Sequence, residues 1–321
     1  MDQASGHNIR SFSSMRKTEI QGCLYILAGA TLWGFSSTVA KALFNIGISP
    51  FQLVSIRLPL ASAMLLATLL LYDRRRVVVA MKDLPYFILF GTLGVVGNQL
   101  TFYFTISKIQ VGPAVLIQYV AVIWITLFAI LFQQEPFSRS TLTAMAFAVL
   151  GCYFVVGGYR TDLLRLNRIG ILYGLLSSFF VAFYALYGEK GLKRYDAWTL
   201  ILYGFALGGI FCWAAFPPLE IFRASYPLKI WGAFLYIAIF ATLIPFGLYF
   251  KGIDRLRATR ASIIGTWEPV MSCITAYFIL GEVLEPLQIL GGLAVIAAVI
   301  VLQLSKEKRR IPTPFEIREA P

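Results

Sequence analysis

The chain has 321 residues, of which 58% are hydrophobic and 14% charged, with a formal net charge of +12 and a mean hydropathy of +0.74. A soluble domain carries about a quarter charged residues, and one water-soluble core could not bury this much apolar surface. The composition therefore indicates an all-α, polytopic membrane protein. The positive charge does not indicate nucleic-acid binding, because the charged residues form short clusters between long apolar runs.

The histidine and cysteine content argues against several kinds of site. The single histidine, His7, lies in a polar N-terminal segment, which excludes embedded metalloenzymes built on HExxH or on histidine boxes. The four cysteines lie within apolar runs, and their spacing shows neither a disulfide framework nor a metal-binding pattern. They are Cys23, Cys152, Cys212 and Cys273. We therefore expect no metal and no cofactor.

Ten runs of about 20 apolar residues, each long enough to cross a bilayer as a helix, follow one another along the chain. They cover residues 20–43, 50–72, 85–107, 111–133, 140–158, 169–188, 197–216, 229–250, 259–280 and 286–304. The short connections leave no room for a folded soluble domain. Residues 1–19 form a polar tail without a signal-peptide cleavage pattern, in which Met15 is an alternative start. Residues 305–321 are basic and then proline-rich, and we expect this end to be disordered.

The distribution of lysine and arginine predicts the orientation of the spans, because cytoplasmic loops are enriched in both residues. With the N-terminus inside, the cytoplasmic segments hold 20 of these residues and the outer segments hold 7. The prediction is a multi-pass protein of the inner or plasma membrane with both termini in the cytoplasm. The loop 159–168, with three arginines on the predicted outer side, goes against the trend.

The sequence repeats itself at an interval of about half its length. The segment GCLYILAGATLWGFSS, which begins at Gly22, is similar to GILYGLLSSFFVAFYA, which begins at Gly170. The segment FYFTISKIQVGPAVLI from Phe102 is similar to YFKGIDRLRATRASII from Tyr249, at almost the same interval. Two matching intervals favour a duplication over a chance alignment of apolar sequence.

The two halves, residues 20–158 and 169–304, each contain five predicted spans, and Glu135 of the first half aligns with Glu282 of the second. Because five is odd, the second half must enter the membrane upside down relative to the first. Inverted repeats of this kind build transporters whose binding site lies near the middle of the membrane. The sequence therefore predicts two inverted five-helix repeats.

Three segments of the chain carry a resemblance to a known family. They are AGATLWGFSSTVAK (28–41), SPFQLVSIRLPLA (49–61) and residues 252–302, with the sequence GIDRLRATRASIIGTWEPVMSCITAYFILGEVLEPLQILGGLAVIAAVIVL. These segments resemble the EamA-type transporters of the drug/metabolite transporter superfamily. The resemblance covers nearly the whole chain, from about residue 20 to residue 304. It implies a ten-helix carrier with both termini inside that moves small organic metabolites, often amino acids, usually outward. It does not indicate the substrate.

Five polar or aromatic residues lie on the small-residue faces of their predicted helices, within the middle half of each span. They are Trp33, Asn98, Gln118, Tyr184 and Tyr249. Tight helix packing with interhelical hydrogen bonds would give the same pattern, and this alternative stays open. An amide near the middle of a bilayer needs either a partner or a wet cavity. We predict that the five residues face one central space, unlike the lipid-facing Leu65 and Val299.

The repeat aligns Asn98 with Pro245, so the same place in both halves holds a residue unsuited to a lipid-facing helix. Pro245 frees a backbone carbonyl near the middle of the membrane, and such a carbonyl can line a cavity. Paired interruptions at corresponding positions of two halves indicate the binding site of a transporter.

Glu268, just before Pro269, is the ionisable residue that lies deepest in any predicted span. A charged carboxylate facing lipid would be costly. We therefore expect Glu268 to be protonated, hydrogen-bonded or at the border of the same cavity. Proton coupling, binding of a substrate amine and a structural hydrogen bond between the repeats are all open roles for it.

The other ionisable residues near the spans have simpler interpretations. Arg57 lies about two turns into the second span, and we expect it to extend to the outer surface or to meet Glu282 or Glu285. Glu135 and Glu189 lie at inner span ends, where we expect them to be solvated.

These observations predict a secondary transporter of small organic solutes, most consistent with efflux, that works by alternating access between the two repeats. No GxxxxGK[ST] motif is present, so ATP would not drive it directly. Expected partners are a small-molecule substrate and the lipid bilayer, with proton coupling and a homodimer left open. The alternatives are a non-transporting membrane scaffold or regulatory protein and, less favoured, a membrane-embedded enzyme, for which no nucleophile–base pair or metal constellation is visible.

The charge distribution and the odd number of spans in each half predict a cytoplasmic C-terminus. A reporter fused after Arg310 that is active only in the cytoplasm should therefore be active in cells. Activity only of a matched reporter that requires export would contradict both the orientation and the inverted repeat.

Overall fold

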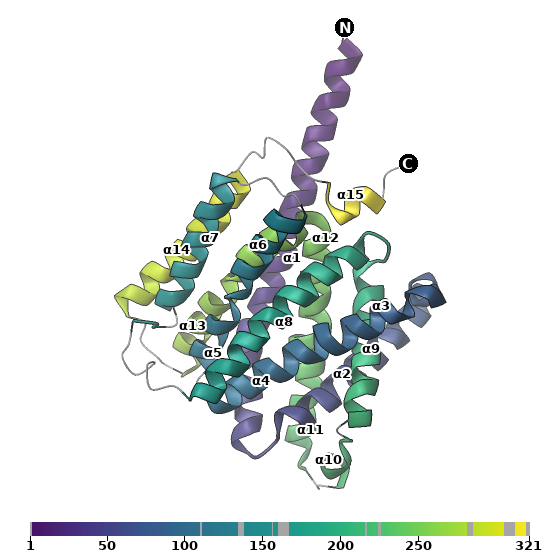
Figure 1. Ribbon diagram of the computed structural model, residues 1–321, viewed down its shortest axis with the longest axis vertical. Helices are drawn as coiled ribbons and strands as arrows, with labels where there is room; N and C mark the ends of the chain where they lie inside the picture. Colours follow the sequence, from purple (N-terminus) through teal and green to yellow (C-terminus); the bar gives the residue numbers. More distant parts are fainter. Residues whose placement is uncertain are drawn as a thin grey trace.

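The computed structural model describes residues 2–109, 111–133, 138–155, 157–159, 167–215, 217–223, 226–280, 285–304 and 312–318, and most side chains from residue 17 onward. These residues form helices and short turns, with no strand among them (Figure 1). The expected helical class is therefore confirmed.

The helices of the first half run from the N-terminus to residue 155. They are α1 (Asp2–Asn45), α2 (Pro50–Tyr72), η1 (Arg74–Val77), η2 (Met81–Asp83), α3 (Leu84–Leu89), η3 (Phe90–Gly97), α4 (Asn98–Lys108), α5 (Val111–Gln118), α6 (Ala121–Phe132) and α7 (Arg139–Val155). The start of α2 illustrates the local signals: Ser49 and Gln52 form a reciprocal capping box, and Pro50 occupies the first turn.

The helices of the second half follow in similar order. They are α8 (Arg168–Leu192), α9 (Ala197–Ala215), α10 (Leu219–Arg223), α11 (Leu228–Tyr236), η5 (Ile237–Leu243), α12 (Ile244–Gly265), α13 (Trp267–Leu280), α14 (Pro286–Leu304) and α15 (Pro314–Arg318). Asn167 caps α8 by accepting hydrogen bonds from the backbone N–H groups of Ile169 and Gly170. Inside α12, Arg257 has φ 71° and ψ 162°, which kinks the helix.

Seven helical segments of the described chain are long and apolar enough to cross a membrane. They are Lys17–Asn45, Pro50–Tyr72, Met81–Lys108, Ala114–Phe132, Arg168–Leu192, Ala197–Ala215 and Leu228–Gly265. Arg139–Val155 and Pro286–Leu302 are apolar but shorter. Large apolar side chains are exposed along these helices, as lipid contact requires; Ile210 is 64% exposed and Leu293 is 57% exposed.

Both terminal segments contain helix. The helix α1 begins at Asp2, so the polar residues before the first span continue the helix. The expectation of a disordered C-terminal end is wrong for Pro314–Arg318, which form α15 against α8 and α12. The polar start of α1 and the short α15 lie at the same end of the molecule, called here the α15 end (Figure 1).

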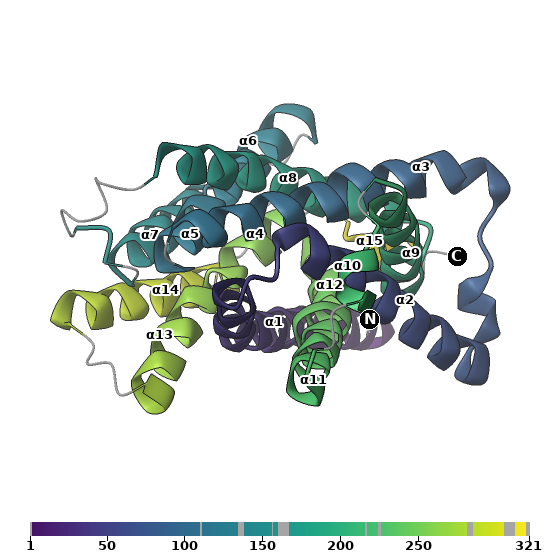
Figure 2. The same cartoon turned by 90° about the horizontal axis from the view of Figure 1, so that it is seen from below.

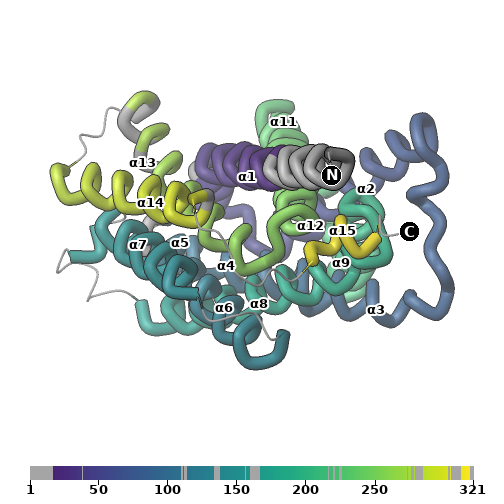
Figure 3. Tube along the Cα trace, turned by 90° about the horizontal axis from the view of Figure 1, so that it is seen from above, coloured from purple at the N-terminus to yellow at the C-terminus, as the bar shows by residue number. Residues whose placement is uncertain are grey.

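Close helix pairs join one half of the chain to the other. Helix α1 packs along α12, α4 along α8, α2 along α9, and α7 along α14, as the views from below and above also show (Figures 2 and 3). The sequence repeat aligns α1 with α8 and α4 with α12. The contact of α1 with α12 therefore corresponds to the contact of α8 with α4.

Two close approaches repeat at the same interval. A Cβ atom on Gly22 of α1 would lie 2.7 Å from Leu256 and 2.9 Å from Arg255. A Cβ atom on Gly170 of α8 would lie 2.8 Å from Ile109 and 3.1 Å from Lys108. Only glycine fits between these helices at either place, which explains why a glycine begins both of the similar segments.

Both halves contain a π-helix at the matching place. The π-helices η3 and η5 begin at Phe90 and Ile237, which the repeat aligns with one another, and each is followed directly by an α-helix. A π-helix is rare and is often found at functional sites. The paired interruption that the sequence indicates at Asn98 and Pro245 lies at the ends of these two segments.

Candidate substrate cavity

One cavity lies between the two halves of the chain, beside the ends of both π-helices. Its volume is about 100 Å³, which is room for several water molecules or part of a small metabolite. Residues of α1, α2, α4, α5, α6, α8, η5, α12 and α13 line it. All six residues singled out from the sequence are among them: Trp33, Asn98, Gln118, Tyr184, Tyr249 and Glu268.

An aromatic wall forms one part of the cavity. The Trp33 ring lies 5.5 Å from that of Tyr249 and 5.1 Å from that of Phe246, and the Tyr184 ring lies 5.9 Å from that of Tyr249. These rings come from α1, α8 and α12, so both halves of the chain contribute to the wall. Flat, slightly polar surfaces of this kind can contact both apolar and cationic parts of a solute.

The two amides are linked to one another. Gln118 donates from Nε2 to Asn98 Oδ1 at 3.2 Å and to Ser177 Oγ at 2.9 Å. Ser177 Oγ also lies 3.4 Å from Asn98 Oδ1. The structure therefore combines the two interpretations left open by the sequence, because these residues bond between α4, α5 and α8 and Asn98 and Gln118 also line the cavity.

Glu268, at the start of α13, meets a tyrosine. The Tyr119 hydroxyl lies 2.9 Å from Glu268 Oε2 and 2.6 Å from the Gly265 carbonyl. One hydroxyl proton can serve only one of these acceptors at a time. When it is donated to Gly265, the contact with Glu268 is a hydrogen bond only if the carboxyl group carries a proton. No lysine or arginine of the described chain forms an ion pair with Glu268.

Pro245 prepares an acceptor in the cavity wall. It has no N–H to donate to the carbonyl of Ala241, four residues earlier. That carbonyl instead accepts hydrogen bonds from Trp33 Nε1 at 3.2 Å and from Arg57 Nη2 at 2.8 Å. The interrupted backbone of η5 thus holds one residue of α1 and one of α2 at the cavity.

The expectation for Arg57 is wrong. Its side chain is 2% exposed and turns inward to line the cavity. Arg57 Nε donates to Thr242 Oγ1 at 2.7 Å, and its guanidinium carbon lies 5.1 Å from the Tyr103 ring centre. Arg57 turns inward because η5 offers it two hydrogen-bond acceptors inside the protein, which stabilise this position more than solvent at the outer surface would. Glu282, one of its two expected partners, lies outside the described residues.

Gln99 is a cavity residue that sequence reasoning missed. It follows Asn98 in α4, is 4% exposed, and neither its Oε1 nor its Nε2 has a hydrogen-bond partner in the described structure. Tyr119, the partner of Glu268, was missed as well. An amide inside an apolar span was the available signal for Gln99, but a helical wheel places it off the face of Asn98 because adjacent residues are about 100° apart.

At the α15 end, an ion pair joins α8 to the kink of α12. Glu189 is 2% exposed; its Oε1 lies 3.0 Å from Arg257 Nε, and its Oε2 accepts the N–H of Ala258 at 2.9 Å. Arg257 also donates to Gln133 Oε1. Glu189 is therefore buried, contrary to the expectation that it is solvated, because the kink turns N–H donors toward it. Glu135 lies outside the described residues.

The opposite end has a related contact. Lys41, which the repeat aligns with Glu189, donates from Nζ to the carbonyls of Ile106 at 2.5 Å and Ile109 at 3.3 Å. These carbonyls end α4, as the residues around Arg257 end the first part of α12. At this end of the molecule the Lys41 ammonium group donates to carbonyls at the end of a helix. At the α15 end the Glu189 carboxylate accepts from a backbone N–H group and a guanidinium group.

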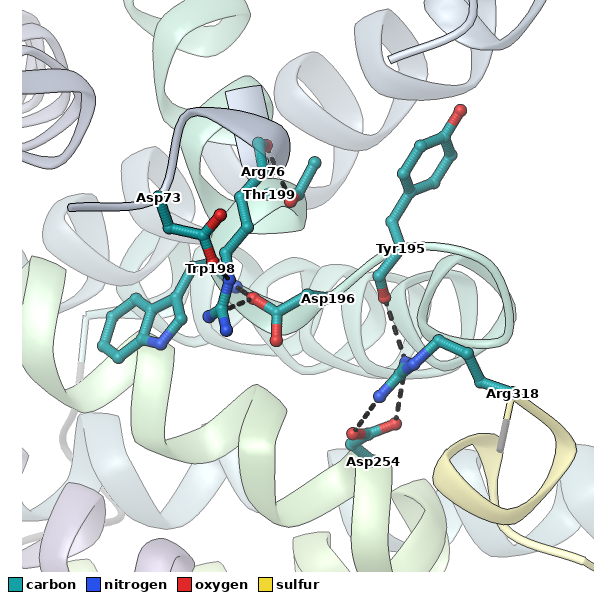
Figure 4. Close-up of polar contacts among 8 residues, drawn as sticks. All are labelled: Asp73, Arg76, Tyr195, Asp196, Trp198, Thr199, Asp254 and Arg318. Atoms are coloured by element: carbon teal, nitrogen blue, oxygen red, sulfur yellow. Dashed lines mark hydrogen bonds and ion pairs between the residues drawn. The ribbon is translucent and has the colours of Figure 1, made fainter. Parts of the chain in front are cut away.

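A second group of ion pairs lies at the α15 end (Figure 4). Arg318 of α15 pairs with Asp254 of α12, Nη2 to Oδ2 at 2.8 Å, and also donates to the carbonyl of Tyr195 at 3.3 Å. Nearby, Arg76 Nε lies 2.8 Å from Asp73 Oδ2, and Arg76 Nη1 lies 3.2 Å from Asp196 Oδ1. These contacts tie the C-terminal helix and the η1 segment to the loop between α8 and α9.

A helical membrane bundle with one polar and aromatic cavity between its halves has the architecture of a small-solute transporter. The sequence model of the EamA-like transporter family matches the chain twice, over residues 20–157 and 168–304. The chain belongs to the EamA-like transporter family.

Characterised and uncharacterised relatives agree with this assignment. The uncharacterized inner membrane transporter YicL of Salmonella typhimurium is 26% identical over 90% of this chain and 97% of its own length. The threonine/homoserine exporter RhtA of Escherichia coli K12 is 26% identical over 89% of this chain and 92% of its own length. Together with the apolar helices, these matches support a multi-pass inner membrane protein.

A solved structure shares the fold. One crystal structure superposes with a TM-score of 0.68 at 16% sequence identity, covering 89% of this chain and 96% of the other. At this identity the likeness concerns the fold alone.

The cavity geometry predicts which positions water can reach. In a cysteine-free background, single cysteines at Trp33, Asn98, Gln118, Tyr184 and Tyr249 should react with small water-soluble thiol reagents, and substrate should slow the reaction. Reaction rates measured by mass spectrometry should exceed those of lipid-facing controls at least about tenfold, because reagents of this kind are excluded from hydrocarbon.

The controls follow from the structure. Leu65 is unsuitable because it is 4% exposed and packs inside the bundle, and Val299 is only partly exposed. Ile210 and Leu293, which lie in the lipid-facing surface, replace them. Equal rates at the cavity positions and at these two controls would show that the solute pathway lies elsewhere.

Proposed function

We propose that this protein is a secondary transporter that carries small organic metabolites, above all amino acids, across the inner membrane. The proposed direction of transport is export. One observation carries the proposal: a cavity lined by polar and aromatic residues of both halves lies beside two paired π-helices. The name of the relative RhtA, a threonine/homoserine exporter, favours amino acids among small metabolites.

The proposed layout has ten spans in two inverted repeats. Support comes from the two family matches, the paired π-helices and the repeated contacts of Gly22 and Gly170. In this layout the kink at Arg257 separates two spans within the long segment that ends at Gly265, and the shorter helices α7 and α14 also cross the membrane. The α15 end, where the polar start of α1 also lies, is the cytoplasmic face.

Alternating access would use the contacts at the two ends of the molecule. The ion pair of Glu189 with Arg257 is the proposed inner barrier, and the contact of Lys41 with the end of α4 is the outer barrier. Because the two contacts stand at matching places of the repeat, opening one while the other closes requires only that the halves exchange conformations.

Glu268 is the proposed proton carrier. It is 6% exposed, lines the cavity, and competes with the Gly265 carbonyl for the hydroxyl proton of Tyr119. A substrate ammonium group that enters would favour the ionised carboxylate, and departure of the substrate would favour the protonated one. Substrate and proton would then bind in alternation, which is the requirement for exchange. A homodimer is compatible with this scheme and is not required by it.

A non-transporting scaffold or regulatory protein is the alternative, and the cavity argues against it. A scaffold does not require buried, charged side chains around an internal space. Apolar residues would pack there without the desolvation free energy that a buried charge costs. A membrane-embedded enzyme is less favoured, because the cavity lining brings Glu268 together with no nucleophile other than hydroxyl groups.

Transport by the purified protein in proteoliposomes tests the function. With a panel of amino acids and other small metabolites inside, an imposed proton gradient should drive efflux of at least one solute. Glu268→Gln should reduce gradient-driven efflux at least about tenfold while counterflow persists at raised concentrations of the same solute. The amide oxygen can still accept a hydrogen bond from the solute, but the side chain cannot release a proton.

Glu285→Gln serves as the matched control, since Glu285 lies outside the cavity lining. No transport of any solute by the wild-type protein would refute the proposed function. Gradient dependence that survives Glu268→Gln would refute only the role of this carboxylate.

The barrier assignment predicts opposite effects at the two ends. With a reporter cysteine at Gln118, Glu189→Gln should increase labelling from the cytoplasmic side, and Lys41→Met should increase labelling from outside. Removing one partner of a buried ion pair costs about 3–5 kcal/mol, enough for at least about a tenfold change in the Glu189 variant. Lys190→Met, an exposed charge beside Glu189, should change neither rate. Changes on the same side in both variants would contradict the assignment.

A further inference from the structure

Arg57 is a buried cation without a counter-ion in the described structure. Its partners are the Thr242 hydroxyl, the Ala241 carbonyl and the Tyr103 ring, all neutral. Its Nη1 donates to none of the described residues, and no described carboxylate lies within 4.0 Å of the guanidinium group. Burying a guanidinium group in this way is costly unless an anion comes to it.

Gln99 is the second unsatisfied group on the same side of the cavity. Its side-chain amide is 4% exposed, lines the cavity, and has no hydrogen-bond partner at either atom in the described structure. Gln99 and Tyr103 are four residues apart in α4 and so share a helix face. Because the Arg57 guanidinium group lies over the Tyr103 ring, the free amide and the cation belong to one part of the cavity wall.

Glu268 stands apart from this pair. No ion pair joins it to Arg57, so the two charges are more than 4.0 Å apart although both line one cavity. Each of the two groups is close to an aromatic residue of the cavity: Arg57 shares the Ala241 carbonyl with Trp33, and Glu268 contacts Tyr119. The cavity therefore offers a cationic part and an anionic part, each next to aromatic surface.

We propose that Arg57 and Gln99 form the subsite for a carboxylate group of the transported solute, with Glu268 receiving its ammonium group. The inference rests on the proposed function and specifies how the substrate is recognised. A carboxylate is planar and accepts two parallel hydrogen bonds, which the guanidinium Nη1 and the amide Nε2 can both supply. A neutral alcohol or amine would leave the guanidinium charge without compensation.

The test compares each amino acid with its own α-amide, which keeps the ammonium group and side chain and removes the negative charge. Binding of the twenty standard amino acids and their amides is measured by calorimetry on the full-length protein in lipid nanodiscs. At least one amino acid should bind the wild-type protein at least about tenfold more tightly than its amide, as expected for a charge-assisted contact. In Arg57→Gln this preference should fall to about one, and Arg57→Lys should retain part of it.

Gln99→Leu keeps the test decisive if Arg57→Gln does not fold, because Gln99 has no bond in the described structure to lose. This variant should show an unchanged or higher unfolding temperature together with at least about a threefold weaker preference for the acid over the amide. A merely structural glutamine would not combine these two effects. Leu100→Met, at the position after Gln99 in α4 but outside the cavity lining, serves as the control and should leave the preference unchanged.

The outcomes separate this proposal from the proposed function. The subsite is refuted if no amino acid binds in preference to its amide, or if the preference survives both Arg57→Gln and Gln99→Leu. Transport restricted to solutes without a carboxylate would refute the subsite and leave transport standing. Acid-over-amide preference that depends on both residues, without flux in proteoliposomes, would support the subsite and refute transport.

Discussion

The arrangement of this protein depends on one constraint: in hydrocarbon, every backbone N–H and C=O group needs a partner within the protein. The described chain meets this constraint with helices almost throughout. Where the hydrogen bonds within a helix are interrupted, the freed backbone group bonds to a side chain instead. Pro245 offers no N–H to the carbonyl of Ala241, and Trp33 and Arg57 donate to that carbonyl instead. The break at Arg257 exposes the N–H of Ala258, which Glu189 accepts. The interruptions thus place the charged and aromatic side chains around the cavity and at its end.

The repetition of contacts between the halves gives these interruptions their arrangement in space. Helix α1 packs on α12 as α8 packs on α4, and the aligned glycines Gly22 and Gly170 permit both approaches. As a result, the end of α4 lies against the start of α8 and the end of α1, and the kink of α12 lies against Gly22 of α1 and the end of α8. The contacts of Lys41 and Glu189 occupy matching places at opposite ends, although one uses a cation and the other a carboxylate. Matching positions have therefore kept their geometry while their chemistry has diverged.

Much of this organisation could be predicted from the sequence. Composition gives the helical membrane class, and motifs such as the one around Trp267 and Glu268 give the family. The small-residue faces pointed to five residues, and its depth in a predicted span pointed to Glu268. The structure brings all six to one cavity, although their role in binding stays a prediction. Arg57 was misplaced because reach to the surface was weighed without the acceptor that Pro245 creates in another helix. Gln99 was missed because a wheel cannot show which buried amides lack partners, and Glu189 because its partner depends on a kink. Such effects arise between helices, where periodicity carries no information.

The paired π-helices make the length of the chain as important as its side chains at two places. A π-helix accommodates an additional residue within an otherwise α-helical span. If the segment Phe90–Gly97 became an α-helix while keeping all its residues, everything after it would rotate by about 100°. Asn98 and Tyr103 would then turn away from the cavity together, without any change in their identity. Loss of one residue in the same stretch would instead allow an α-helix that keeps the following residues on their present face. Among relatives, a gap in these short stretches would therefore mark the loss of the π-helix with the cavity lining kept in place.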